Sequence, residues 1–321
     1  MNIGLTFDLQ TDPGDERQAE FDPPATVDAL HTALESLGHR VTRLGGAHDL
    51  ISRREPLDRI DLVFNIAEGR GGRCREAWVP MLLEQWGVPY VGSTASAQAL
   101  GLDKVMSKRL AAASGVSTPR WCVMKDAAVA IPSGRCVFPA IVKPRYEGSG
   151  LGIGPAAIVH DEEALRRRVG EVAARFGQPC LVEEFIGFGE LTVFLIGNAP
   201  PHALPAVQRP LDPATRLSCH VVRAPEGAAW LTPLDLTPTL DAAAREAAVA
   251  VFEALRCRDM ARVDFRVDEQ GRLYFLEINP LPSFAPDGSL GLLADYLGTT
   301  YAALVGRIVE AAVQRTALHA S

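Results

Sequence analysis

The chain has 321 residues, which is long enough for two domains or for three small domains around a shared cleft. Hydrophobic residues make up 47% and charged residues 22%, a balance that excludes a disordered protein, and the formal net charge of -7 argues against a nucleic-acid partner. No apolar run approaches the ~20 residues of a membrane span, and Asp8 interrupts the opening stretch too early for a signal peptide, so we expect a cytoplasmic protein with no membrane partner. The six cysteines form no CxxC pair and are expected to be buried, reduced thiols.

The first part of the chain alternates between strand-like and helix-like patterns. Short apolar runs occupy residues 3–7, 41–44 and 61–66, and residues 26–37 carry apolar side chains at helical spacing. Strands that alternate with helices predict a parallel sheet covered by helices. We therefore predict a doubly wound α/β domain over residues 1–98, whose last strand is expected at residues 88–93.

The second part, residues 99–182, is predicted to be a small α+β unit. Residues 103–114 have a helical pattern, and residues 138–144 form a short apolar run that precedes a glycine-rich segment at 147–154. Flexible glycines let backbone N–H groups approach a polyphosphate, with Ser149 and Lys143 as further donors. This segment is neither a Walker A motif nor a GxGxxG turn, so a phosphate lid and a plain flexible loop both fit it.

The third part, residues 183–321, contains a strand at 190–196, a helix at 241–255 and a hairpin at 261–279. If Val267 pairs with Arg272, Arg262 lies opposite Glu277, and Asp264 and Asn279 share their face by the period of two. Carboxylate and amide oxygens beside an arginine suit Mg²⁺ ions that also take phosphate oxygens. A solvated antiparallel face fits the same composition.

Two weaker patterns also suit a site that binds phosphate. Only four of the 32 cationic residues are lysines, namely Lys104, Lys108, Lys125 and Lys143, so each has a raised chance of a role that arginine cannot fill, such as a compact charge on a phosphate. Residues 181–190 are an apolar strand that ends in acids, which could read an adenine edge and a ribose. Taken alone, that segment is better interpreted as a strand and turn with solvated acids.

The order of these segments resembles the ATP-grasp superfamily. Within it, residues 88–93 (VPYVGS), 99–108 (ALGLDKVMSK), 261–265 (ARVDF) and 276–282 (LEINPLP) are similar to the D-alanine:D-alanine ligases. The similarity runs from about residue 61 to the C-terminus. It implies an ATP-grasp fold of three subdomains: the doubly wound N-terminal one, a small central α+β one, and a C-terminal α+β one with an antiparallel sheet.

The resemblance also implies roles for individual residues. Nucleotide contacts fall on Lys104, Lys143, Ser149, Gly150, Glu183, Glu184, Phe185, Ile186 and Glu190. Two Mg²⁺ ions, or Mn²⁺ in their place, would be held by Asp264, Glu277 and Asn279. Catalysis would rest on Arg262, Ser149 and Lys143. The reaction implied is ATP-dependent amide formation between a carboxylate and an amine through an acyl phosphate, in a homodimer.

The sequence departs from those ligases where amino-acid substrates would bind. Residues 6–15 (TFDLQTDPGD) replace a Gly-Gly-x-Ser segment with its following Glu, and residues 65–76 (NIAEGRGGRCRE) replace a His-Gly segment. The family's loop Tyr and Lys are not visible in residues 208–226, and its Pro-Gly becomes Pro282-Ser283. The substrate candidates are therefore Asp8, Glu68, Arg70, Arg73, Glu76, Ser283, Asp287 and Ser289.

These departures predict a substrate pair other than two D-alanines. Three alternatives stay open: an authentic D-alanine:D-alanine ligase of cell-wall synthesis, acylphosphate chemistry on a metabolite that is not an amino acid, and a non-catalytic ATP-binding regulatory module. Intact positions 143, 264, 277 and 279 argue against the last of these, because a binding-only site could lose its metal ligands.

Overall fold

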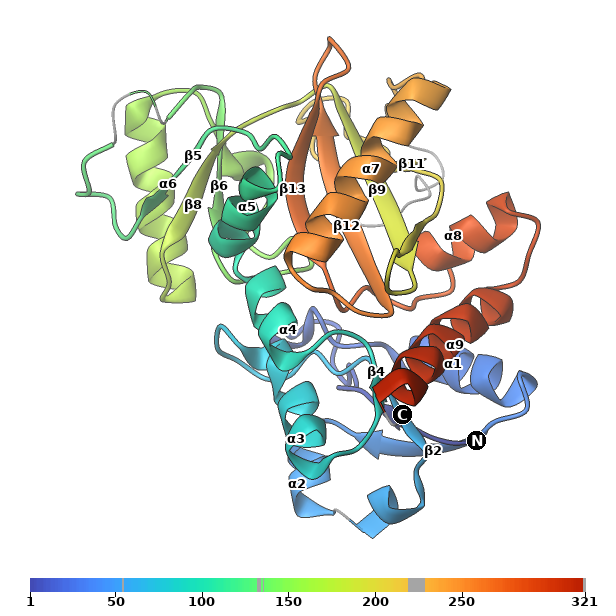
Figure 1. Ribbon diagram of the computed structural model, residues 1–321. Coiled ribbons are helices and arrows are strands. Elements are labelled where there is room, and N and C mark those ends of the chain that lie inside the picture. The colour runs from blue at the N-terminus through green and yellow to red at the C-terminus, as the bar shows by residue number, and fades with distance from the viewer. Residues whose placement is uncertain (54, 132–133, 135, 219–228, 320–321) are drawn as a thin grey trace.

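The computed structural model describes residues 1–53, 55–131, 134, 136–218 and 229–319. Within these residues the strands form three sheets, each accompanied by helices (Figure 1). No helix of these ranges is both long enough and apolar enough to cross a membrane. The domain boundaries at residues 98 and 182 stay predictions.

The first sheet is parallel, as the sequence predicts. Its strands are β1 (Asn2–Thr6), β2 (Arg40–Gly45), β3 (Leu62–Asn65) and β4 (Tyr90–Val91), in the order β2-β1-β3-β4. Helices α1 (Pro24–Ser36), α2 (Ala47–Ser52) and α3 (Trp78–Trp86) connect them. Helix α1 buries Val27, Leu30 and Leu34, which recur at helical spacing, in the core beside β1 and β3.

The end of the chain returns to this first sheet. Helices α8 (Ser289–Tyr296) and α9 (Tyr301–His319) place Leu304, Val305 and Ile308 in the same core as α1, and Figure 1 shows α9 beside α1. Arg315 of α9 donates to the buried carboxylate of Asp259 at 2.7 Å and to the carbonyl of Tyr90 at 2.7 Å. The C-terminal helix therefore links the first sheet to the strand that follows Asp259.

The second sheet is antiparallel and lies in the central part of the chain. Its order is β5-β8-β6-β7, with β5 (Trp121–Met124), β6 (Ala140–Pro144), β7 (Ile158–Val159) and β8 (Cys180–Glu184). Helix α6 (Glu162–Phe176) packs on it through Leu165, Val169 and Val172. Helices α4 (Ala95–Leu102) and α5 (Lys104–Ala113) precede it, and the Asp103 side chain caps α5 by accepting from Val105 and Met106.

The third sheet is antiparallel and has an apolar face that packs against a helix. It contains β9 (Gly189–Ile196), β10 (His202–Ala203), β11 (Val207–Gln208), β12 (Met260–Val267) and β13 (Leu273–Asn279). Alternate residues such as Val193, Val263 and Phe265 pack with Ala248 and Val251 of α7 (Pro238–Ala254). On the opposite face, Phe194, Ile196 and Met260 join the core of the first sheet, and the remaining positions carry polar side chains.

The predicted register of the hairpin is wrong. Val267 pairs with Leu273 rather than with Arg272, and the register shifts again between Asp264 and Phe265. The extra residue on β13 forms a β-bulge, so Asp264 lies directly opposite Glu277 and Arg262 lies opposite Asn279. The bulge keeps all four polar side chains on one face, which is the part of the prediction that holds.

The expectation of buried thiols also needs a correction. Cys122, Cys180 and Cys257 are buried, but Cys74 is exposed and Cys136 is only partly buried. Cys74 precedes the short helix Arg75–Ala77 in a loop, where the backbone leaves its side chain in solvent.

Candidate functional site

Four polar side chains converge on the face of the third sheet opposite α7. Asp264 of β12 pairs directly with Glu277 of β13, and Arg262 pairs with Asn279 two residues along each strand. Directly opposed residues of an antiparallel pair lie on the same face, at Cβ separations of roughly 5 Å. The strand register therefore brings two carboxylates, an amide and a guanidinium group together.

Asp264 is the most enclosed of these groups, with 2% of its surface exposed. Its Oδ1 accepts a hydrogen bond from the hydroxyl of Thr192 on β9 at 2.6 Å. Arg262 donates from Nη2 to Oδ2 at 2.8 Å and from Nε to Oδ1 at 3.0 Å. A buried carboxylate held by neighbours on both sides has a fixed orientation toward the cavity.

Glu277 is paired across the site with Lys104, the first residue of α5. The Lys104 ammonium group donates to Oε2 of Glu277 at 2.8 Å. Burial raises the pKa of Glu277, but the Lys104 charge and hydrogen bond, together with the charges of Lys143 and Arg262, outweigh it and bring the pKa well below its usual range. Glu277 is therefore an anion at neutral pH, as a metal ligand must be.

A buried pair of lysines holds the carboxylate of Glu183 on β8. Lys108 of α5 donates to Oε1 at 2.8 Å, and Lys143 of β6 donates to Oε2 at 3.2 Å. Burial raises the pKa of Glu183, and the two ammonium groups outweigh it and lower that pKa. Lys108 itself is wholly buried, and burial lowers its pKa to about 8. Glu183 thus positions Lys143 at the edge of the cavity.

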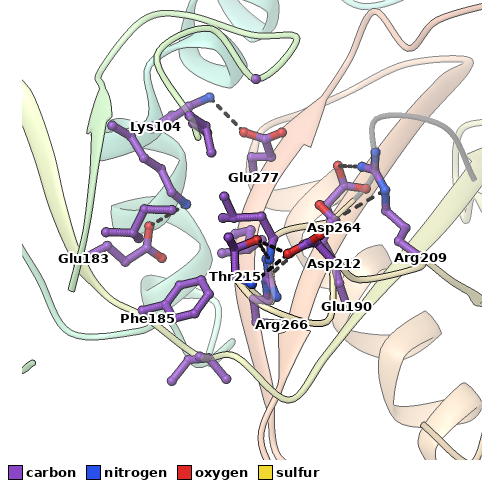
Figure 2. A pocket seen from close by; sticks show the side chains of 18 of the residues that line it. Lys104, Glu183, Phe185, Glu190, Arg209, Asp212, Thr215, Asp264, Arg266 and Glu277 are labelled. Carbon is purple, nitrogen blue, oxygen red and sulfur yellow. Dashed lines mark hydrogen bonds and ion pairs between the residues drawn. The ribbon is translucent and has the colours of Figure 1, made fainter. Parts of the chain in front are cut away.

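Two arginines that sequence reasoning missed complete the polar face. Arg266 lies 2.9 Å from Glu190, and Arg209 lies 3.5 Å from Glu190 and 3.7 Å from Asp264. Figure 2 shows Arg209 directed at Asp264 and Lys104 directed at Glu277. The alternation of residues on β12 could have identified Arg266, whereas Arg209 follows the two-residue strand β11 and gives no such signal.

A cavity of about 370 Å³ lies between the second and third sheets. Phe185 and Ile186, which connect β8 to β9, form part of its wall, and the Arg266 guanidinium lies 5.4 Å from the centre of the Phe185 ring. Its other predicted residues are Lys104, Lys143, Gly150, Glu183, Glu184, Glu190, Asp264 and Glu277. The indole nitrogen of Trp230, also in this wall, is buried and has no hydrogen-bond partner among the described residues. A slot with one apolar wall and cationic side chains suits a nucleotide with its phosphates.

A second cavity, of about 430 Å³, adjoins the first through shared lining residues that include Lys104, Gly150 and Glu277. It is lined by the predicted residues Arg262, Asn279, Ser149, Glu68, Glu76 and Ser283. The structure therefore brings the predicted phosphate and metal residues next to part of the predicted substrate set.

Other predicted substrate residues lie elsewhere. Asp8 and Arg70 line a third cavity, of about 930 Å³, in which the Asp8 carboxylate accepts from the backbone N–H of Gly69 at 2.8 Å. Arg73 and Asp287 are exposed, and Ser289 begins α8; none of the three lines these cavities. Residues 219–226 of the loop expected to lack the family's Tyr and Lys lie outside the described residues.

The glycine-rich segment is tied at its start to the N-terminal part of the chain. Gly148 donates its N–H to Oε1 of Glu20 at 2.8 Å, and Glu20 also pairs with Arg75 at 2.6 Å. Ser149 and Gly150 then adopt positive φ values of 46° and 69°. This left-handed backbone exposes Ser149 at the second cavity.

The polar face fits a divalent metal. Asp264 and Glu277 supply hard anionic oxygens, and the buried amide nitrogen of Asn279 has no hydrogen-bond partner in the described chain, so its amide is not committed elsewhere. No cluster of three His, Cys, Asp or Glu side chains in the described ranges is arranged to hold a metal by itself. A mixed set completed by phosphate oxygens is the coordination this site offers.

Comparison with known proteins agrees with this geometry. The profile of the family described as D-ala D-ala ligase C-terminus matches residues 110–310. The chain is 34% identical to the uncharacterized protein y4sG of Sinorhizobium fredii, over 90% of this chain and 88% of that protein. It is also 34% identical to a D-alanine–D-alanine ligase of Syntrophotalea carbinolica, over 90% of this chain and 91% of the relative.

Solved structures show the same fold. A D-alanine–D-alanine ligase from Bacillus anthracis superposes with a TM-score of 0.76 at 24% identity, covering 98% of both chains. The VanG D-Ala:D-Ser ligase from Enterococcus faecalis gives a TM-score of 0.77 at 18% identity, covering 97% of this chain and all of the other. The chain therefore belongs to the D-alanine–D-alanine ligase family, has the ATP-grasp fold, and is an ATP-dependent carboxylate–amine ligase of that kind.

Proposed function

We propose that the chain binds ATP in the 370 Å³ cavity and transfers its γ-phosphoryl group to a carboxylate in the adjoining one. The observation that carries this proposal is the placement of three cations along the two adjoining cavities: Lys143 lines the first, Arg262 lines the second, and Lys104 lines both. These cations come from the second sheet, α5 and the third sheet, so only the folded chain assembles them. Cations placed around a transferring phosphoryl group stabilise its spreading charge.

The base of the nucleotide would lie against Phe185 and Ile186, with Glu184 at its edge and Glu190 toward the ribose. Lys143, held by Glu183, and Lys104 would contact the phosphates, and the segment with Ser149 and Gly150 would cover them. Asp264, Glu277 and Asn279 would hold two Mg²⁺ ions, or Mn²⁺, which neutralise charge on the phosphate oxygens when bound.

The reaction would then proceed in two steps. A carboxylate is a poor electrophile, so it must first be converted to an acyl phosphate, and an amine then displaces the phosphate and forms the amide bond. Arg262 lines the second cavity, where it would hold the oxyanion of the tetrahedral intermediate. Neither step requires a covalent bond between the enzyme and its substrate.

We further propose a substrate pair other than two D-alanines. The second cavity carries Glu68 and Glu76 from the segment that replaces the family's His-Gly sequence. The relative from Syntrophotalea carbinolica is named a D-alanine–D-alanine ligase, and the sequence differences from such ligases lie at the walls that would contact an amino acid rather than at the ATP cavity. Assembly as a homodimer in the cytoplasm stays a prediction.

A substitution on the polar face of the third sheet, where the metal ions would bind, tests the proposed function. Asp264→Asn should lower the rate of ADP release by orders of magnitude while circular dichroism and melting temperature show an intact fold, because the amide cannot replace the carboxylate's charge. Glu269→Gln, on the exposed turn of the same hairpin, is the matched control and should leave the rate unchanged. Wild-type turnover in Asp264→Asn would remove Asp264 from the proposed site.

A further inference from the structure

Four acids from the N-terminal part of the chain line the second cavity, and most of them have no cationic partner among the described residues. Glu20 and Asp22 precede α1, and Glu68 and Glu76 lie between β3 and α3. Glu20 is committed, because it accepts from Arg75 and from the N–H of Gly148. Within the described chain, the side chains of Asp22, Glu68 and Glu76 have no hydrogen bond and no cation within 4 Å.

Two of these acids are deeply enclosed. Asp22 and Glu76 are each 8% exposed, and Glu68 is partly buried. Their carboxylate oxygens make no hydrogen bond to a described residue, yet none of them is among the fully buried atoms that lack a partner, so these oxygens keep some accessible surface. All three side chains line the second cavity, and we take that surface to open into it. A buried carboxylate without a partner is unfavourable unless a bound cation or a proton satisfies it.

The cations of this cavity are engaged at its other side. Lys104 pairs with Glu277, and Arg262 and Arg209 lie beside Asp264. The three free acids also do not form a cluster of metal-binding geometry. They surround about 430 Å³ of space, which is room for an organic molecule rather than for an ion alone.

We infer that this cavity takes a substrate with a second amine, a diamino acid of the ornithine or lysine type. The inference rests on the proposed function, which places the substrate carboxylate near Arg262 and Lys104. From there the molecule would extend toward Asp22, Glu68 and Glu76. One α-ammonium group supplies a single positive charge to a wall with three acids, whereas the side-chain ammonium of a diamino acid supplies a second cation and three more donors.

Binding to matched pairs of amino acids tests the inference directly. The full chain with Mg²⁺ and a non-hydrolysable ATP analogue would be titrated calorimetrically with ornithine and norvaline, then with lysine and norleucine, in both configurations. Each pair differs by the terminal amine, so the diamino acid of at least one pair should bind roughly ten- to a hundredfold more tightly, as expected for hydrogen bonds to charged groups. Equal or tighter binding of the neutral partner in every pair would overturn the inference.

Isosteric variants assign that preference to the acids. Asp22→Asn and Glu68→Gln should each reduce the preference for the diamino acid about tenfold or more without changing the Mg²⁺ dependence of nucleotide binding. Glu246→Gln on the exposed side of α7 is the control and should keep the preference. An altered Mg²⁺ dependence with an unchanged preference would assign the acids to the metal and overturn the inference.

The test separates this inference from the proposed function. ADP release in the same samples measures ligase activity. The calorimetric preference measures whether the wall formed by Asp22, Glu68 and Glu76, here called the acid wall, binds the second amine. ADP release with neutral amino acids and no preference for diamino acids would leave the ligase intact and refute the diamino substrate. A clear preference without ADP release under any pair would keep the acid wall as an amine site and count against the proposed function.

Discussion

The four lysines of the chain differ sharply in their surroundings. Lys125 is exposed, whereas Lys104, Lys108 and Lys143 are buried and each contacts an acid of the site. Composition alone marks lysine as the residue type to examine in an arginine-rich chain, and the motifs select Lys104 and Lys143. Lys108 lies one helical turn after Lys104, yet its pairing with Glu183 joins residues 75 positions apart in the chain, which no local pattern shows.

The first prediction concerns these lysines. Lys143→Ala should raise the KM for ATP about tenfold or more, because a charge-assisted contact to phosphate is lost. Lys108→Met should raise it too, since Glu183 would then draw Lys143 away from the cavity. Steady-state ADP release at varied ATP measures both, with Lys125→Ala as the control. An equal KM in all three variants would show that the placement of these lysines has no bearing on the nucleotide.

A second prediction uses the buried acid Asp22. Burial raises its pKa from 3.8 to about 7, so between about pH 4 and pH 7 the folded state keeps a proton that the unfolded state releases. The stability of the wild type must therefore fall as pH rises through that window. Asp22→Asn lacks this penalty and should be more stable at pH 8, on the order of a few kcal/mol, but not at pH 4.

Thermal or urea unfolding at the two pH values checks this second prediction. Asp58→Asn, an exposed acid of the same part of the chain, should show the same difference from the wild type at pH 4 and pH 8. A gain in Asp22→Asn that is equal at both pH values would contradict the titration of Asp22 and point to a packing effect instead.

Single elements show what periodicity can and cannot predict. The alternation in residues 261–267 correctly places Arg262 and Asp264 on one face, and the same holds for Glu277 and Asn279. The pairing between the strands is different, because a bulge depends on the length of the turn and on the partner strand β9, to which Asp264 is bonded through Thr192. The polar face was therefore predictable from the sequence, but the opposition of Asp264 and Glu277 was not.

The glycine-rich segment supports a third prediction, at the scale of an element. Residues 148–154 combine four glycines with few side chains that could pack, so they should open easily without nucleotide. Amide hydrogen exchange there should slow when a non-hydrolysable ATP analogue and Mg²⁺ are added. The segment 162–176 of α6, which packs on the second sheet, serves as the internal control and should not change. Unchanged exchange in 148–154 at saturating nucleotide would rule out a lid.

The lining of the second cavity was the hardest part to predict, because it is assembled from distant parts of the chain. The acids Glu20 and Asp22 belong to the first sheet's connections, whereas Arg262 and Glu277 belong to the third sheet, and they meet only in the folded chain. The return of α9 onto α1 and the Arg315–Asp259 pair fix these parts together, and no short-range pattern signals that contact. The alternating strands and helices predicted the parallel sheet itself, because local periodicity determines it.

The whole chain is expected to work as an ATP-dependent carboxylate–amine ligase whose substrates are not two D-alanines. The most direct measurement is ADP release by the full chain with ATP and Mg²⁺, supplied with D-alanine alone and, in parallel, with pairs drawn from L- and D-amino acids and other amines. We expect ADP release with at least one carboxylate–amine pair and weak or no release with D-alanine alone. Efficient synthesis of D-alanyl-D-alanine, at rates above every other pair, would contradict the claim and assign the chain to the reaction of its named relatives.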